Sequence, residues 1–289
     1  MKIGYPCINT AINCTANSTF RLANLSEQNL IDRITGNLNC LEKILFYNTE
    51  KKLLFFRIGS GLIPFAGHKN FRFDWPARFG EKIKKIGDYV KRNEIRISMH
   101  PDQFVLINSP DRKLVQNSLS EIEWHCRLLD LMGLDRTAKV QIHIGGAYGD
   151  KISALDRFSF NYLQLPRSIK ERLVVENDER IYSLKDCLDL SAKIGLPVLF
   201  DSFHHDCLNN GEEMLEALKK AGKTWKKEDG VPMTDYSSQE PGGRRGKHAQ
   251  KIDLDHFRSY LDSVRGIDFD IMLEIKDKEE SALKALRVI

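Results

Sequence analysis

The feature that most constrains the fold of this chain is an eightfold alternation of short β-rich runs with helical segments. The runs are mostly apolar, and the segments that follow place apolar residues at helical spacing, as in 26–46. The predicted strands are 1–6, 53–59, 96–101, 139–146, 172–178, 198–205, 231–238 and 270–276. The predicted helices are 26–46, 79–92, 112–132, 151–163, 183–194, 211–221, 253–262 and the charged C-terminal segment.

Eight β/α units are typical of an α/β protein built as a (β/α)8 TIM barrel, which needs about 250 residues. The chain has 289 residues and shows no linker-like change of composition, so we predict one barrel domain over 1–289. An open, doubly wound sheet also alternates strands and helices. The barrel is favoured because no glycine-rich phosphate loop follows the first run, and because eight strands close a barrel.

Composition limits the class of protein. Hydrophobic residues make up 42% and charged residues 29%, which predicts a soluble protein with a large core, and the net charge of +4 permits an anionic partner. No apolar run approaches the roughly 18 residues of a membrane span. We expect a cytoplasmic monomer that does not contact membranes. Its widely spaced cysteines are predicted to be free thiols: Cys7, Cys14, Cys40, Cys126, Cys187 and Cys207.

Metal-binding side chains gather where the predicted strands end, which is where TIM barrels carry their active sites. Those at strand ends are His100, His143, Glu176, Asp201, His204 and Glu274, and those in the loops beyond are His68 and His248. His205 follows His204 and is predicted to be a bystander, whereas His125 and His256 lie in helices. Mixed imidazole and carboxylate ligands suit Zn, Mn or Fe, and this number of ligands predicts two or three ions.

Clustered divalent ions can bind a phosphodiester and promote its hydrolysis. Basic residues near the predicted mouth fit a phosphate backbone: Arg244, Arg245, Lys247, Lys69 and Lys151. An ordinary solvated loop remains an alternative for 244–247.

With these residues in place, the sequence resembles the UV damage endonuclease family, which is related to endonuclease IV. The match runs through GYPCIN, FRIGSGLIPFAGH, SMHPDQF, HIGGAYGDK, ENDER, FDSFHHD, SSQEP with a following KHA, and LEIKDKE. The resemblance implies a metal-dependent enzyme that nicks double-stranded DNA immediately 5′ to UV photoproducts, leaving a 3′-hydroxyl and a 5′-phosphate. The photoproducts are cyclobutane pyrimidine dimers and 6-4 products. It also implies Mn²⁺ as the usual ion, with Mg²⁺ or Zn²⁺ as alternatives, and association with the nucleoid in a prokaryote.

The resemblance also assigns roles residue by residue. It implies catalytic roles for Glu176, Glu274 and His143, and metal binding by His68, His100, His143, Glu176, Asp201, His204, His248 and Glu274. Gln103 and Phe104 would enter the duplex where the damaged dinucleotide is turned out, and the family more often has Tyr in place of Phe104. Tyr5 and Asn9 would line the lesion pocket. A structural role for these two in the first turn of the barrel stays open.

One departure from the family concerns a K-x-H pattern before SSQ, in which the His binds metal and the Lys carries a carboxylate modification. Here Met233 and Asp235 stand at those positions. Asp235 is a candidate metal ligand, since carboxylate oxygen suits Mn. Its structural alternative is to cap the turn before Ser237. Met233 cannot carry the modification.

Three other functions remain to be weighed. A sugar isomerase or epimerase would share the barrel and the metal chemistry, but it would need a small closed pocket. A damage-binding protein without catalysis would not need so many ligands. Abasic sites, rather than photoproducts, could be the main substrate.

Overall fold

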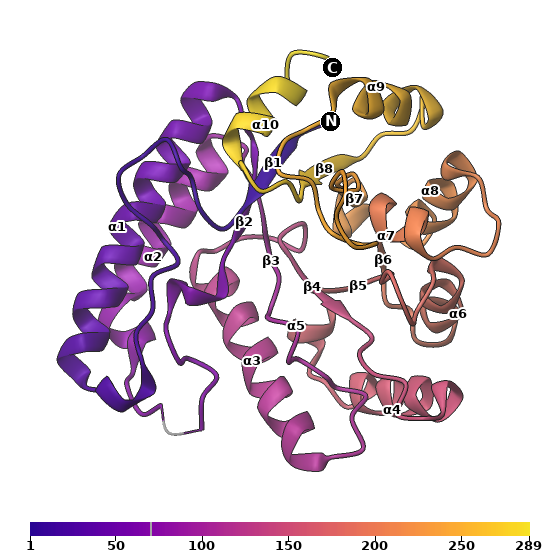
Figure 1. Ribbon diagram of the computed structural model, residues 1–289. Coiled ribbons are helices and arrows are strands. Elements are labelled where there is room, and N and C mark those ends of the chain that lie inside the picture. Colours follow the sequence, from indigo (N-terminus) through magenta and orange to yellow (C-terminus); the bar gives the residue numbers. More distant parts are fainter. Residues whose placement is uncertain (70) are drawn as a thin grey trace.

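The computed structural model describes residues 1–69 and 71–289 and contains a closed barrel of eight parallel strands, each paired with the next and β8 with β1 (Figure 1). The prediction of a (β/α)8 barrel is confirmed. The strands are β1 (Ile3–Pro6), β2 (Phe55–Ile58), β3 (Arg96–Met99), β4 (Lys139–His143), β5 (Leu173–Glu176), β6 (Val198–Asp201), β7 (Met233–Tyr236) and β8 (Asp270–Leu273).

Helices surround the barrel and cover its outer face (Figure 1). They are α1 (Glu27–Lys51), α2 (Trp75–Arg92), α3 (Arg112–Leu131), α4 (Lys151–Leu163), α5 (Arg167–Lys170), α6 (Leu184–Ile194), α7 (Ser202–Cys207), α8 (Met214–Gly222), α9 (Leu254–Ser263) and α10 (Glu279–Ala285). Short 3₁₀ turns lie at Leu22–Asn24, Ser60–Leu62 and Lys227–Asp229. Many helices begin where a side chain accepts a backbone N–H of the first turn. These caps are Ser26, Asp74, Asp111, Asp150, Asp201 and Asp253.

The interior of the barrel changes from apolar to polar within two residues on each of five strands. Side chains alternate across a strand, so residues two apart both point inward. The apolar layer consists of Phe55, Val174, Leu199, Met233 and Met272, which pack together. Two residues further along the same chain segments stand Arg57, Glu176, Asp201, Asp235 and Glu274. A carboxylate-rich layer therefore lies directly next to the apolar layer inside the barrel.

The structure corrects the predicted path of 198–205. Strand β6 ends at Asp201, and helix α7 begins at once, so His204 and His205 lie on a helix rather than on an extended segment. Asp201 accepts the backbone N–H of His204 at 2.7 Å, and this cap starts the helix. The D-x-x-H spacing brings Asp201 and His204 together because residues three apart on a helix are neighbours.

The prediction of six free thiols is wrong for one pair. Cys14 and Cys40 form a disulfide, with their Cα atoms 5.9 Å apart. Cys40 lies on α1, and the segment after β1 folds back over that helix, a path that spacing along the sequence does not reveal. Cys7, Cys126, Cys187 and Cys207 are free. Among the described residues, no helix combines the length and apolarity needed to cross a membrane.

Candidate functional site

The C-terminal ends of the strands open into a cavity of about 780 Å³. Its walls combine candidate metal ligands, an aromatic side chain and basic groups. They include Arg57, His100, Gln103, Phe104, His143, Arg244, Lys247, His248, Glu274, Lys276 and Lys278. Of the ligands predicted at strand ends, His100, His143 and Glu274 line this cavity.

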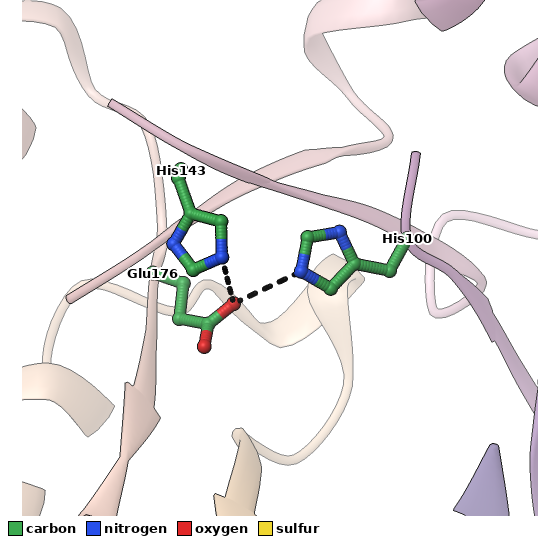
Figure 2. A group of neighbouring side chains, drawn as sticks. All are labelled: His100, His143 and Glu176. Atoms are coloured by element: carbon green, nitrogen blue, oxygen red, sulfur yellow. Dashed lines mark ion pairs between the residues drawn. The ribbon is translucent and has the colours of Figure 1, made fainter. Parts of the chain in front are cut away.

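The first group of potential ligands consists of His100, His143 and Glu176, from the ends of β3, β4 and β5. Figure 2 shows both imidazoles turned toward the same Glu176 oxygen, with Nε2 of His100 3.4 Å and Nε2 of His143 3.7 Å from Oε2. Glu176 is buried, whereas the two imidazoles are partly exposed to the cavity.

A second group shares Glu176 with the first and adds Asp201 and His204. Nδ1 of His204 lies 3.1 Å from Glu176 Oε1 and 3.4 Å from Asp201 Oδ2. The same nitrogen lies 2.9 Å from the carbonyl oxygen of Asn177, whose side chain bonds the backbone of Asp201. Asn177 thus links the ends of β5 and β6. A hydrogen bond from Nδ1–H to the Asn177 carbonyl leaves Nε2 as the His204 nitrogen available to an ion, the arrangement that metal-binding imidazoles commonly show.

A third group consists of Asp201, Asp235 and Glu274. Here a buried cation is already present: Arg57 Nη2 lies 2.7 Å from both carboxylate oxygens of Asp235, and Nη1 pairs with Glu274 Oε1. Gln141 completes the network by accepting a hydrogen bond from Arg57 Nη2 at 2.7 Å and donating one to Asp235 Oδ2 at 2.6 Å. The structural alternative for Asp235, a cap on the following turn, has no support in these contacts.

Negative charge exceeds positive charge in this layer. Burial raises the pKa of Asp201 to about 8. Burial also acts to raise the pKa of Glu176, but the imidazoles of His143, His100 and His204 offset it and hold that pKa well below its usual range. An excess of buried carboxylates is the arrangement that cations stabilise.

The Arg57 pair has its own electrostatics. Burial acts to raise the pKa of Glu274, yet Arg57 holds it at about 2. Burial acts to lower the pKa of Arg57, and Asp235 and Glu274 raise it above its usual range. Burial and the neighbouring carboxylates raise the pKa of Asp235 against the charge of Arg57. Both Asp235 oxygens nevertheless accept hydrogen bonds, as an ionised carboxylate does.

The remaining predicted histidine ligands lie further out. His248 lines the cavity, and its Nδ1 lies 3.0 Å from the carbonyl oxygen and 3.7 Å from the Oε2 of Glu274. His68 lines a neighbouring hollow with Lys69 and Phe104. Neither belongs to the three ligand groups found among residues 1–69 and 71–289. His205 is also outside them and packs against Phe200.

The predicted DNA-facing residues divide into those at the cavity and those away from it. Gln103 and Phe104 are exposed on its wall, and Phe104 keeps 71% of its surface in solvent. Arg244 and Lys247 also line it. Arg245 is tied elsewhere, since its Nη2 donates to the carbonyl oxygen of Cys207 at 2.5 Å. Lys151 pairs with Asp186 at 2.7 Å, a contact that occupies its ammonium group.

Tyr5 and Asn9, which were predicted to line the lesion pocket, are buried. Tyr5 is 0% exposed; its hydroxyl donates to Asn48 Oδ1 at 2.6 Å and accepts from Asn9 Nδ2 at 2.7 Å. Asn9 Oδ1 accepts the backbone N–H of Ala11 at 2.9 Å. These contacts match the structural alternative, in which both residues hold the turn after β1.

Sequence reasoning missed Arg57, Gln141, Lys276 and Lys278. The signal for Arg57 was present, because inward-facing positions alternate along β2 and Arg57 follows Phe55 by two residues. Gln141 precedes His143 by two residues in the same way. Lys276 and Lys278 stand in the LEIKDKE motif, next to Glu274, but their spacing alone does not say that they line the cavity.

The family model described as UV-endonuclease UvdE matches residues 1–288. The UV DNA damage endonuclease of Clostridium perfringens (strain 13 / Type A) is 39% identical over 288 residues, which cover 99% of this chain and 70% of that protein.

Solved structures are also similar to this chain. The crystal structure of SacUVDE superposes with a TM-score of 0.95 at 44% identity and covers 100% of this chain and 97% of that one. Endonuclease IV from Thermus thermophilus superposes with a TM-score of 0.59 at 16% identity, over 100% of this chain and 97% of that one, and this likeness shows a shared fold alone.

Proposed function

The chain belongs to the UV-endonuclease UvdE family, and from that premise we propose that it is a metal-dependent endonuclease that nicks double-stranded DNA immediately 5′ to UV photoproducts. The products would be a 3′-hydroxyl and a 5′-phosphate. Cyclobutane pyrimidine dimers and 6-4 products are the proposed lesions, and abasic sites are a further substrate to be tested.

One observation carries this proposal: two ligand groups share Glu176, and His100 and His143 of the first group line a cavity whose wall also holds an exposed aromatic residue and, besides the buried Arg57, four cationic side chains. The cations are Arg244, Lys247, Lys276 and Lys278. Several cations beside clustered ligands suit a polyanion such as the DNA backbone. A sugar isomerase would have no use for this basic rim or for the projecting Phe104.

The residues present fit divalent ions. Asp201 Oδ2, a buried atom of the second ligand group, has no hydrogen-bond partner within the described part of the chain. The contacts of 3.4 and 3.7 Å from the imidazoles to Glu176 are too long for good hydrogen bonds. They match the separation of about 3.4 Å expected for two ligands that each lie roughly 2.1 Å from one ion.

We assign the ligands accordingly. As a member of both groups, Glu176 would take part in holding two ions, of which His100 and His143 would hold one and Asp201 and His204 the other. Divalent ions bound there supply positive charge for the phosphodiester and lower the pKa of water. The nitrogen and oxygen donor set suits Mn²⁺, with Zn²⁺ and Mg²⁺ as alternatives.

His143 and Glu176 are the proposed catalytic ligands, together with Glu274, which lies on the cavity wall. His248 sits beside Glu274 and is proposed as an outer ligand. The position of His68 in a separate hollow gives no support for including it.

Lesion recognition is assigned to Gln103 and Phe104. An enzyme that acts on a damaged dinucleotide must take it out of the base stack, and an apolar side chain can fill the space that is left. Phe104 projects from the cavity wall and is mostly exposed, so it is free to enter a duplex laid across the cavity.

The test is incision of end-labelled duplexes that carry a cyclobutane dimer, a 6-4 product, an abasic site or no lesion. We expect cutting of the photoproduct duplexes with Mn²⁺, no cutting after chelation, and a loss of several orders of magnitude in Glu176→Gln. Glu216→Gln is the matched control, since it makes the same change on an exposed face of α8, where Glu216 pairs with Lys220. Equal cutting of undamaged duplex, or conversion of ketoses by the same preparation, would contradict the proposal.

A further inference from the structure

Arg57 occupies an unusual position for a charged residue. It stands at the end of β2, points into the barrel, and is 3% exposed. Phe55, two residues earlier on the same strand, belongs to the apolar layer. Its guanidinium contacts Asp235, Glu274 and Gln141. A cation buried in this way is held by its partners, because leaving them would strand an unpaired charge.

The three ligand groups differ in how far their atoms are already satisfied. In the groups that share Glu176, Asp201 Oδ2 lacks a hydrogen-bond partner among the described residues, and Nε2 of His100 and of His143 lie 3.4 and 3.7 Å from Glu176 Oε2, which accepts its hydrogen bond from Gln141 Nε2. In the third group, Asp235 accepts from Arg57 at both oxygens and from Gln141 at one, while Glu274 pairs with Arg57. Two of its three members are therefore committed to a cation.

A divalent ion in the third group would meet that cation at close range. The potential ligand atoms of Asp201, Asp235 and Glu274 lie within 4.8 Å of one another, and Arg57 is already bonded to two of these residues. An ion among them would either sit next to the guanidinium, with strong repulsion, or displace it from carboxylates that a buried Arg cannot replace.

We propose that Arg57 is the resident cation of the third group, so that the centre binds two divalent ions rather than three and Asp235 is the counterion of Arg57 rather than a metal ligand. The inference rests on the proposed metal-dependent function for its two ions. The inference explains why a carboxylate, Asp235, lies on β7 opposite Arg57 on β2. One guanidinium and two carboxylates form a compact unit that stays charged.

Counting bound ions tests the inference directly. Wild-type protein would be titrated with MnCl₂ by calorimetry and its bound Mn measured by mass spectrometry after gel filtration. We expect two ions per chain in the wild type and still two in Asp235→Asn. Arg57→Gln removes the cation but leaves the three carboxylates, so its count should rise to three. Glu176→Gln loses the ligand shared by both groups and should bind fewer than two ions. This variant shows that the measured ion count responds to the loss of a ligand.

Three ions in the wild type, with one lost in Asp235→Asn, would overturn the inference. A count of two in folded Arg57→Gln would also overturn it, because the guanidinium would then not be what excludes the third ion. If Arg57→Gln does not fold, the wild-type count and its change in Asp235→Asn decide, since the inference gives two ions and no change, and the alternative gives three ions and the loss of one. The measurement needs no DNA. A protein that binds two ions but leaves irradiated DNA intact would refute the proposed function and retain the inference.

Discussion

Phe104 offers the sharpest test of lesion recognition, because its role can be separated from folding. The side chain lies between β3 and α3 on the cavity wall and is 71% exposed. Replacing it with alanine removes few contacts within the protein. We therefore expect Phe104→Ala to keep the free energy of unfolding within about 0.5 kcal/mol of the wild type.

The expected effect on binding follows from stacking. An aromatic side chain that stacks on a base contributes roughly 1–3 kcal/mol. At about 1.4 kcal/mol per tenfold change, Phe104→Ala should weaken binding to a photoproduct duplex by about 5- to 150-fold. Undamaged duplex resists extrusion of its bases, so insertion contributes less there and the loss should be smaller. The ratio of the two affinities should thus fall.

The assay is fluorescence anisotropy with matched duplexes at one salt concentration. The Glu176→Gln background prevents cutting during the titration. Phe160→Ala is the control, because Phe160 is similarly exposed at 65% but lies on α4 and does not line the cavity. Phe104→Tyr keeps the ring and should bind like the wild type. Equal losses of affinity for the photoproduct and undamaged duplexes, or an equal loss in Phe160→Ala, would refute the insertion of Phe104 into the duplex.

Three other expectations follow from named contacts. Lys247→Ala should reduce the slope of log affinity against log salt by about 0.9, the value of one phosphate contact, whereas Arg245→Ala should change it less because Arg245 is bound to a backbone carbonyl. Burial lowers the pKa of His125 to about 3, so between about pH 6.5 and 3 the unfolded state binds the extra proton and stability falls as the pH drops. His125→Gln should remove a dependence that approaches about 1.4 kcal/mol per pH unit below pH 6, measured by urea unfolding at pH 7, 6 and 5; the same pH dependence in wild type and variant would contradict this. Cys14→Ser removes the disulfide to Cys40, which closes a loop of 26 residues, and should lower the free energy of unfolding by about 3.5 kcal/mol. An unchanged thermal midpoint would show that the disulfide contributes nothing to stability.

Local patterns in the sequence were enough to predict the barrel and much of its active face. Apolar runs and helical spacing depend on neighbours two to four residues apart, and eight such units close a parallel barrel. His100, His143 and Glu176 come together because each ends a strand, and all strands of a parallel barrel end on the same face. The position of a residue along its own strand is therefore sufficient to place it there.

Tertiary structure alone decided which of these residues are partners. The pairing of Arg57 with Asp235 joins β2 to β7 across the barrel interior and depends on strand tilt and stagger, which no short pattern encodes. The Cys14–Cys40 bond depends on the path of a loop over α1, and the position of His68 depends on the loop after β2. Local spacing sets the direction in which a side chain points. What it meets there is set by the packing of segments distant in the sequence.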